Sequence, residues 1–165
     1  MKATTMLRRQ HDRIAQVVGA LEHEKHLRAA LFMELGEELM ALIAIEESVF
    51  YPCVQDVAGV RLSEHRADHA RARSALQAIA SCVPPASSDA AAFASRFREL
   101  RTTVERHIAL ERSALFPAVE SELGDEALEH LGKRMREFLS ARASLARTTS
   151  PTFGVGGAVG DLLAS

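Results

Sequence analysis

The feature that most constrains this sequence is a series of long segments whose apolar residues recur at alternating spacings of three and four. One such segment carries Leu7, Ile14, Val18 and Leu21. This spacing places the apolar side chains on one face of a helix, and several such helices bury those faces best against one another. We therefore predict an all-α fold, an antiparallel up-down-up-down four-helix bundle with an additional C-terminal helix.

Breaks in the pattern divide the chain into five predicted helices. They are residues 4–26, 27–55, 63–82, about 90–123 and 125–147. Pro84 and Pro85 end the third segment, the cluster 87–89 is typical of a helix N-cap, and Gly124 breaks the chain after the fourth. Residues 1–147 are predicted to form one helical domain, and residues 148–165, rich in Gly, Ser and Thr, a flexible tail.

Composition excludes several classes of partner. The chain has 165 residues, which suits one domain, and its net charge of −2 indicates neither a nucleic-acid nor a membrane partner. No run approaches the roughly 20 apolar residues of a membrane span, and the N-terminus lacks an apolar signal core. We therefore expect a cytoplasmic protein. The pattern leaves its oligomeric state open.

Six polar residues occupy positions in the helical seams where an apolar residue is expected. They are His11, Glu46, His65, His69, His107 and Glu111. In an alternating bundle, early positions of the first and third helices lie level with late positions of the second and fourth, so all six should meet at one height. Burying an unpaired carboxylate or imidazolium is costly, which makes a shared cation the simplest explanation.

The residue types indicate which cation would suit this cluster. Imidazole and carboxylate ligands are typical of iron, manganese and zinc sites, and a carboxylate can bridge two ions. A single His in a seam is more often a hydrogen-bonded core residue than a ligand, but six polar residues from four helices favour a metal. The three remaining histidines fall off the seams and are predicted to lie at the surface: His23, His26 and His130.

An internal repeat relates the second and fourth helices. Residues 42–52 read LIAIEESVFYP and align without gaps on residues 107–117, which read HIALERSALFP. Each copy delivers one Glu, and the Pro that ends each copy should kink or end its helix at an equivalent height. The most important mismatch is Leu42, which stands where the second copy has His107.

These motifs resemble the hemerythrin family, also called hemerythrin-like HHE cation-binding domains. The features are a HxxxE motif before an apolar stretch and Pro, an early His11-Asp12 pair, and the HxxxH pair of His65 and His69. The resemblance covers about residues 4–123. It implies a four-helix bundle with a di-iron centre that binds oxygen, nitric oxide or related small oxidants.

The resemblance also implies a ligand set. One iron would take His65, His69 and His107, with Glu46 and Glu111 as bridges; the second would take His11 and a histidine whose place is held here by Leu42. Leucine cannot ligate a metal, and Glu38, one turn away, lies about 6 Å further along the axis. We therefore expect two iron ions, the second bound more weakly. In the family, the iron with fewer His ligands takes up oxygen, so the weakened site is the reactive one.

Three functions are compatible with these observations. We favour a metal-binding protein that binds or senses oxygen, nitric oxide or peroxide, with any signal passed to a protein partner. The alternatives are a degenerate, metal-free helical scaffold, which the loss of a ligand at Leu42 supports, and a di-iron enzyme that consumes peroxide. A ferritin-like oxidase is disfavoured, because no His in this chain follows a Glu by three residues.

Overall fold

The computed structural model describes residues 1–57, 61–80 and 90–149. Over these ranges the chain is helical and contains no strand, which confirms the predicted all-α class for the described residues. None of the described helices is both long enough and apolar enough to cross a bilayer. The predicted N-cap at 87–89 and residues 150–165 of the predicted tail lie outside the described residues.

The helices follow the predicted segments with differences at their ends. Their bounds are α1 Ala3–His23, the 3-10 turn η1 Lys25–Leu27, α2 Arg28–Ile45, the π-helical turn η2 Glu46–Phe50, α3 Tyr51–Val54, α4 Leu62–Ala80, α5 Ala90–Leu110, the π-helical turn η3 Glu111–Leu115, and α6 Phe116–Thr149. The first helix ends three residues earlier than predicted, because Glu24 leaves the helical region with φ −94 and ψ 67. Gly124, with φ 71, kinks α6 where the break was predicted.

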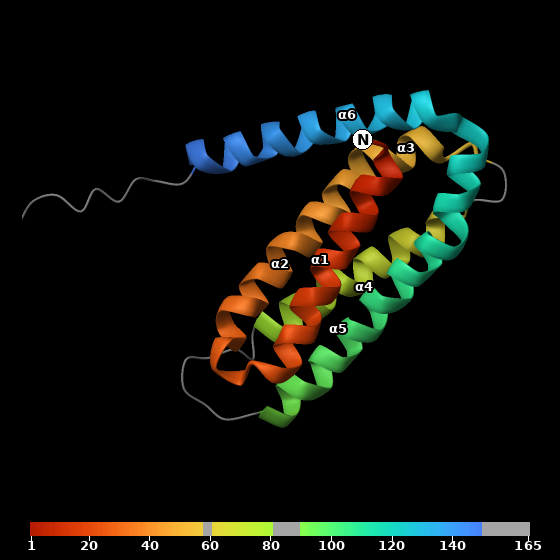
Figure 1. The fold of residues 1–165 in the computed structure, drawn as a ribbon. Helices are drawn as coiled ribbons and strands as arrows, with labels where there is room; N and C mark the ends of the chain where they lie inside the picture. The colour runs from red at the N-terminus through yellow and green to blue at the C-terminus, as the bar shows by residue number, and fades with distance from the viewer. Residues whose placement is uncertain (58–60, 81–89, 150–165) are drawn as a thin grey trace, which may run out of the picture.

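The long helices α1, α2, α4 and α5 lie side by side, while α6 continues from α5, turns at its kink and crosses one end of the bundle (Figure 1). The predicted seams form the core between them. Leu7, Ile14 and Leu21 of α1 are buried, as are Leu35 and Leu39 of α2. Each fully buried side chain of this size stabilises the fold by about 1.5–3 kcal/mol. The histidines predicted at the surface, His23, His26 and His130, are exposed.

The part of α6 beyond Gly124 packs closely on the start of α1. A Cβ atom added at Gly132 would overlap the carbonyl oxygen of Met1, so this approach requires a glycine. Leu128, Leu131 and Met135 of the same helix are also buried. The part of α6 beyond Gly124 is therefore packed against this end of the bundle.

Candidate metal centre

Two π-helical turns place the central carboxylates. Glu46 opens η2 and Glu111 opens η3, and each accepts at its carbonyl a hydrogen bond from the backbone N–H five residues later. The donor of each of these hydrogen bonds, Tyr51 or Phe116, is followed by a proline, Pro52 or Pro117. Proline has no N–H, and its ring crowds the preceding helical turn. A wider π turn relieves that conflict. Each helix therefore widens before its proline, where we had predicted a kink or an end.

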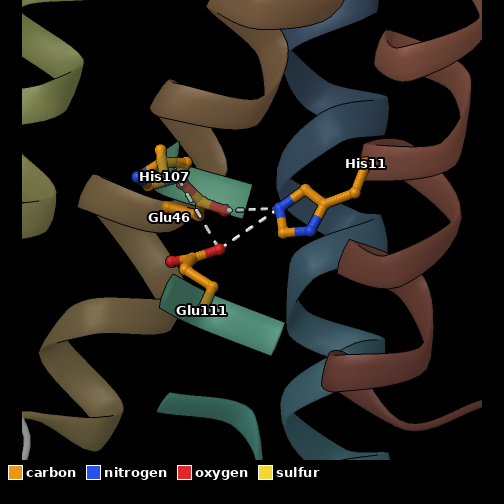
Figure 2. Close-up of side chains that lie close together, drawn as sticks. All are labelled: His11, Glu46, His107 and Glu111. Carbon is orange, nitrogen blue, oxygen red and sulfur yellow. Dashed lines mark ion pairs between the residues drawn. The ribbon is translucent and has the colours of Figure 1, made fainter. Parts of the chain in front are cut away.

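Four buried side chains bring their ligand atoms together. One atom each from His11, Glu46, His107 and Glu111 lies within 4.8 Å of the others (Figure 2). His11 Nε2 is 3.2 Å from Glu111 Oε2 and 3.7 Å from Glu46 Oε1. His107 Nε2 is 3.5 Å from Glu46 Oε2 and 3.7 Å from Glu111 Oε2. The four residues come from α1, η2, α5 and η3, so the centre joins distant parts of the chain.

The polar atoms of this quartet are incompletely satisfied by the protein. Within the described residues, five of its buried atoms form no hydrogen bond of adequate geometry: His11 Nε2, both ring nitrogens of His107, Glu46 Oε1 and Glu111 Oε2. A buried polar group without a partner costs about 1–3 kcal/mol. Two imidazole nitrogens and two carboxylates that converge in this way fit iron, manganese or zinc. The quartet could therefore hold a metal ion.

The two histidines of α4 lie beside the quartet. His69 Nε2 is 2.9 Å from Glu46 Oε2, and its ring centroid is 4.7 Å from that of His107. His65 Nδ1 is 3.9 Å from Glu111 Oε1, and its ring centroid is 5.6 Å from that of His107. All six predicted residues thus gather in one place, with His11 and His107 in the tightest group and His65 at its edge.

Glu47, which the sequence did not single out, contacts the His69 ring on the side away from the centre. Its Oε1 atom lies 2.9 Å from His69 Nδ1, while Arg73 donates to both of its carboxylate oxygens, at 3.2 and 2.7 Å. Although burial acts the other way, Arg73 and His69 hold the pKa of Glu47 below its usual value. A carboxylate on Nδ1 fixes the orientation of the ring and leaves Nε2 available to the centre.

Tyr51 is a second residue that the sequence did not single out. It is fully buried, and its hydroxyl donates to Glu111 Oε1 at 2.8 Å and lies 3.4 Å from both Glu46 Oε2 and His69 Nε2. Burial and the charges of the two carboxylates raise the pKa of Tyr51, so its hydroxyl remains a neutral donor. The available signal was its place in the repeat, where the second copy has Phe116.

Arg112 contacts His11 on the side away from the carboxylates. Its Nε donates to His11 Nδ1 at 3.4 Å, and its Nη2 donates to the Arg8 carbonyl and to Asp12 Oδ1, at 2.7 and 2.6 Å. A guanidinium only donates, so Nδ1 is the acceptor and the ring proton of neutral His11 lies on Nε2, facing the carboxylates. A metal ion at Nε2 would have to displace that proton.

The charges of the centre are strongly coupled. Burial disfavours the Glu46 carboxylate, but the neighbouring imidazoles of His107, His11 and His69 hold its pKa well below its usual range. Burial and the charge of Glu46 raise the pKa of Glu111. Burial also disfavours the His107 imidazolium, yet Glu46 and Glu111 outweigh it and raise the pKa of His107 to about 9. The metal-free centre therefore retains protons that a cation would displace.

Leu42, which aligns with His107 in the repeat, places an apolar side chain beside the centre. It is buried and, with Leu39 and Ile43, lines a void of about 10 Å³ beside His69 and His107. Glu38 does not substitute for the missing ligand, because its carboxylate faces Arg13, 3.8 Å away.

Comparison with known families agrees with this geometry. The model of the hemerythrin HHE cation binding domain matches residues 2–119, which include all six predicted site residues and both copies of the repeat. No curated protein and no solved structure matches the chain. The matched region runs from α1 into the first turn of α6 and covers well over half of the sequence. The chain therefore belongs to the hemerythrin HHE cation-binding domain family.

Proposed function

We propose that this protein binds non-haem iron in its buried centre and uses it to bind or sense oxygen, nitric oxide or peroxide. The observation that carries the proposal is the convergence of two imidazoles and two carboxylates from four elements, with at least one unpartnered polar atom on each. Bound iron would supply a redox-active ion with an open coordination position. A protein partner would receive any resulting signal.

In this proposal the residues of the centre have different roles. Glu46 and Glu111 would be available as ligands to both of two ions; His65, His69 and His107 would hold one ion, and His11 would hold the other weakly because Leu42 offers no ligand. Tyr51 and Glu47 orient the ligands through the hydrogen bonds described above. We infer that the supporting frame is an up-down-up-down bundle with an additional C-terminal helix, within a domain of residues 1–147 that precedes a flexible tail.

Two observations favour a second candidate, a helical scaffold that has lost its metal. Leu42 removes a ligand, and Arg112 holds His11 in a form whose Nε2 carries a proton. A scaffold of this kind would retain the fold and would recognise a protein partner through its surface.

Elemental analysis of protein purified without a metal-affinity tag separates the two candidates. We expect between about one and two iron ions per chain after growth in iron-rich medium, and a visible spectrum that changes on exposure to azide, nitric oxide or peroxide. Glu46→Gln combined with Glu111→Gln should abolish both signals. Negligible metal after growth and after anaerobic reconstitution would instead support the scaffold; stoichiometric manganese or zinc would correct the choice of metal.

A further inference from the structure

One surface cleft reaches the edge of the metal centre. It has a volume of about 170 Å³, opens between α4 and the segment formed by η3 and the start of α6, and has His65 in its wall. Its other lining residues include Leu110 and the small residues Ala114 and Ala118. Small side chains on this segment leave room for a ligand to approach.

His65 connects this cleft with the buried carboxylates. Its side chain is 9% exposed, whereas those of His11, Glu46 and Glu111 are 0% exposed. Its Nδ1 atom is buried without a hydrogen-bond partner among the described residues and faces Glu111 Oε1 at 3.9 Å. One ring thus lies between the surface cleft and a central carboxylate.

Two other sides of the centre are closed by packed side chains, one beside Leu42 and one beside His11. Beside Leu42, the void of about 10 Å³ holds at most a single water molecule. Phe116 stacks on the His11 ring with centroids 5.6 Å apart, and Arg8 covers the Phe116 ring. A small ligand would therefore meet least resistance at His65.

Charges around the cleft favour an anion. A larger hollow of about 380 Å³ adjoins the cleft and shares Glu64 and Leu110 with it. The charged residues that line the two hollows are Arg61, Arg71, Arg106, Glu64 and Asp68. Arg71 and Arg106 both pair with Asp68, so the lining of the two hollows together carries an excess of one positive charge. A positive entrance raises the local concentration of small anions.

We propose that this cleft is the route by which small anions of the size of azide reach the metal centre, that His65 is the first ligand they meet, and that Leu110 and Ala114 set the width of the passage. This inference rests on the proposed function, since it assigns an entrance to the same centre. It adds two specificity-determining residues, Leu110 and Ala114, that lie outside the ligand set.

The test compares two neighbouring residues of η3 that are both small and exposed. Ala114 lines the cleft and Ser113 does not. With iron-loaded protein, stopped-flow absorbance should show azide associating about tenfold more slowly with Ala114→Phe, at unchanged iron content, and within about twofold of the parent rate with Ser113→Phe. Leu110→Ala should accelerate association. Equal rates in Ala114→Phe and Ser113→Phe would overturn the route.

A second measurement on metal-free protein separates failure of the route from failure of the proposed function. Diethyl pyrocarbonate labelling, read by mass spectrometry, should modify His65 faster than His11 or His69, and Ala114→Phe should slow the labelling of His65 alone. If the protein fails to bind iron but shows this order, the entrance stands and the proposed function fails. If iron-loaded protein binds azide but His65 is labelled no faster than His11, the route fails and the function stands.

Discussion

Residues 42–52 and 107–117 follow the same backbone course but meet different neighbours. Both copies place a Glu at the start of a π-helical turn and a Pro two residues after the end of that turn. The shared elements therefore fix where the two carboxylates lie. They explain why two helices that are far apart in sequence deliver matching groups to one point.

Three mismatches between the copies decide what surrounds those carboxylates. Leu42 aligns with His107, so only the second copy offers an imidazole at this position. Glu47, whose carboxylate contacts His69, aligns with Arg112, whose guanidinium donates to His11. Tyr51, which donates to Glu111, aligns with Phe116, which stacks on His11. The comparison indicates that the backbone of the repeat sets the position of the centre, while the differing side chains set its asymmetry.

Removing the histidine from the second copy should have the largest effect. His107→Leu makes this copy match Leu42 of the first and deletes a group that touches both carboxylates. We expect iron affinity to fall by more than the roughly 10–100-fold loss typical of an outer-shell partner. Elemental analysis after dialysis measures it, with His130→Leu on the exposed surface as the control. Full iron content in His107→Leu would remove this residue from the ligand set.

Restoring the histidine in the first copy should act in the opposite direction. Leu42→His returns the missing ligand type, and the iron content should rise to about two ions per chain. Leu39→His is the matched control, because Leu39 is also buried and lines the same void. Thermal unfolding would confirm that both variants fold. An iron content that stays at the parent value in Leu42→His would contradict the assignment of this position.

Replacing Tyr51 with the phenylalanine of the second copy should have an intermediate effect on iron affinity. Tyr51→Phe removes the donor to Glu111 and keeps the ring, so we expect a loss of about 10–100-fold in iron affinity. Competition with a chelator measures the change. The unfolding free energy should fall by only about 0.5–1.5 kcal/mol, the usual net contribution of one hydrogen bond. An affinity equal to that of the parent would show that this hydroxyl has no part in ligand positioning.

The smallest effect concerns the pH dependence of the metal-free protein. The folded-state pKa of His107 is about 9, above its ordinary value of 6.5. Its contribution to stability is therefore fully present below pH 6.5 and is lost as the pH rises through 9. The thermal midpoint of metal-free protein should decrease over this interval, and the decrease should be smaller in His107→Leu. A midpoint that rises with pH in the parent would contradict the raised pKa.

The sequence predicted the helical class and the meeting of the six polar residues because both follow from the regular spacing of apolar and polar residues along the chain. It did not predict the π turns, since a turn one residue wider leaves the apolar seam recognisable. The sequence did not single out Tyr51, because its hydroxyl matters only when Glu111 lies opposite. Which of the six form the tightest group depends on side-chain directions that spacing does not encode, and the cleft at His65 depends on packing between α4 and η3.

The close approach at Gly132 ties the axial position of α1 to a residue outside residues 2–119, the span of the family match. His11 lies about two helical turns beyond the contact of α1 with this glycine. A larger residue there would push the start of α1 outward, and the rigid helix would carry His11 with it. We therefore expect that a substitution at Gly132 shifts His11 and changes the metal affinity of the centre without altering any of its candidate ligands.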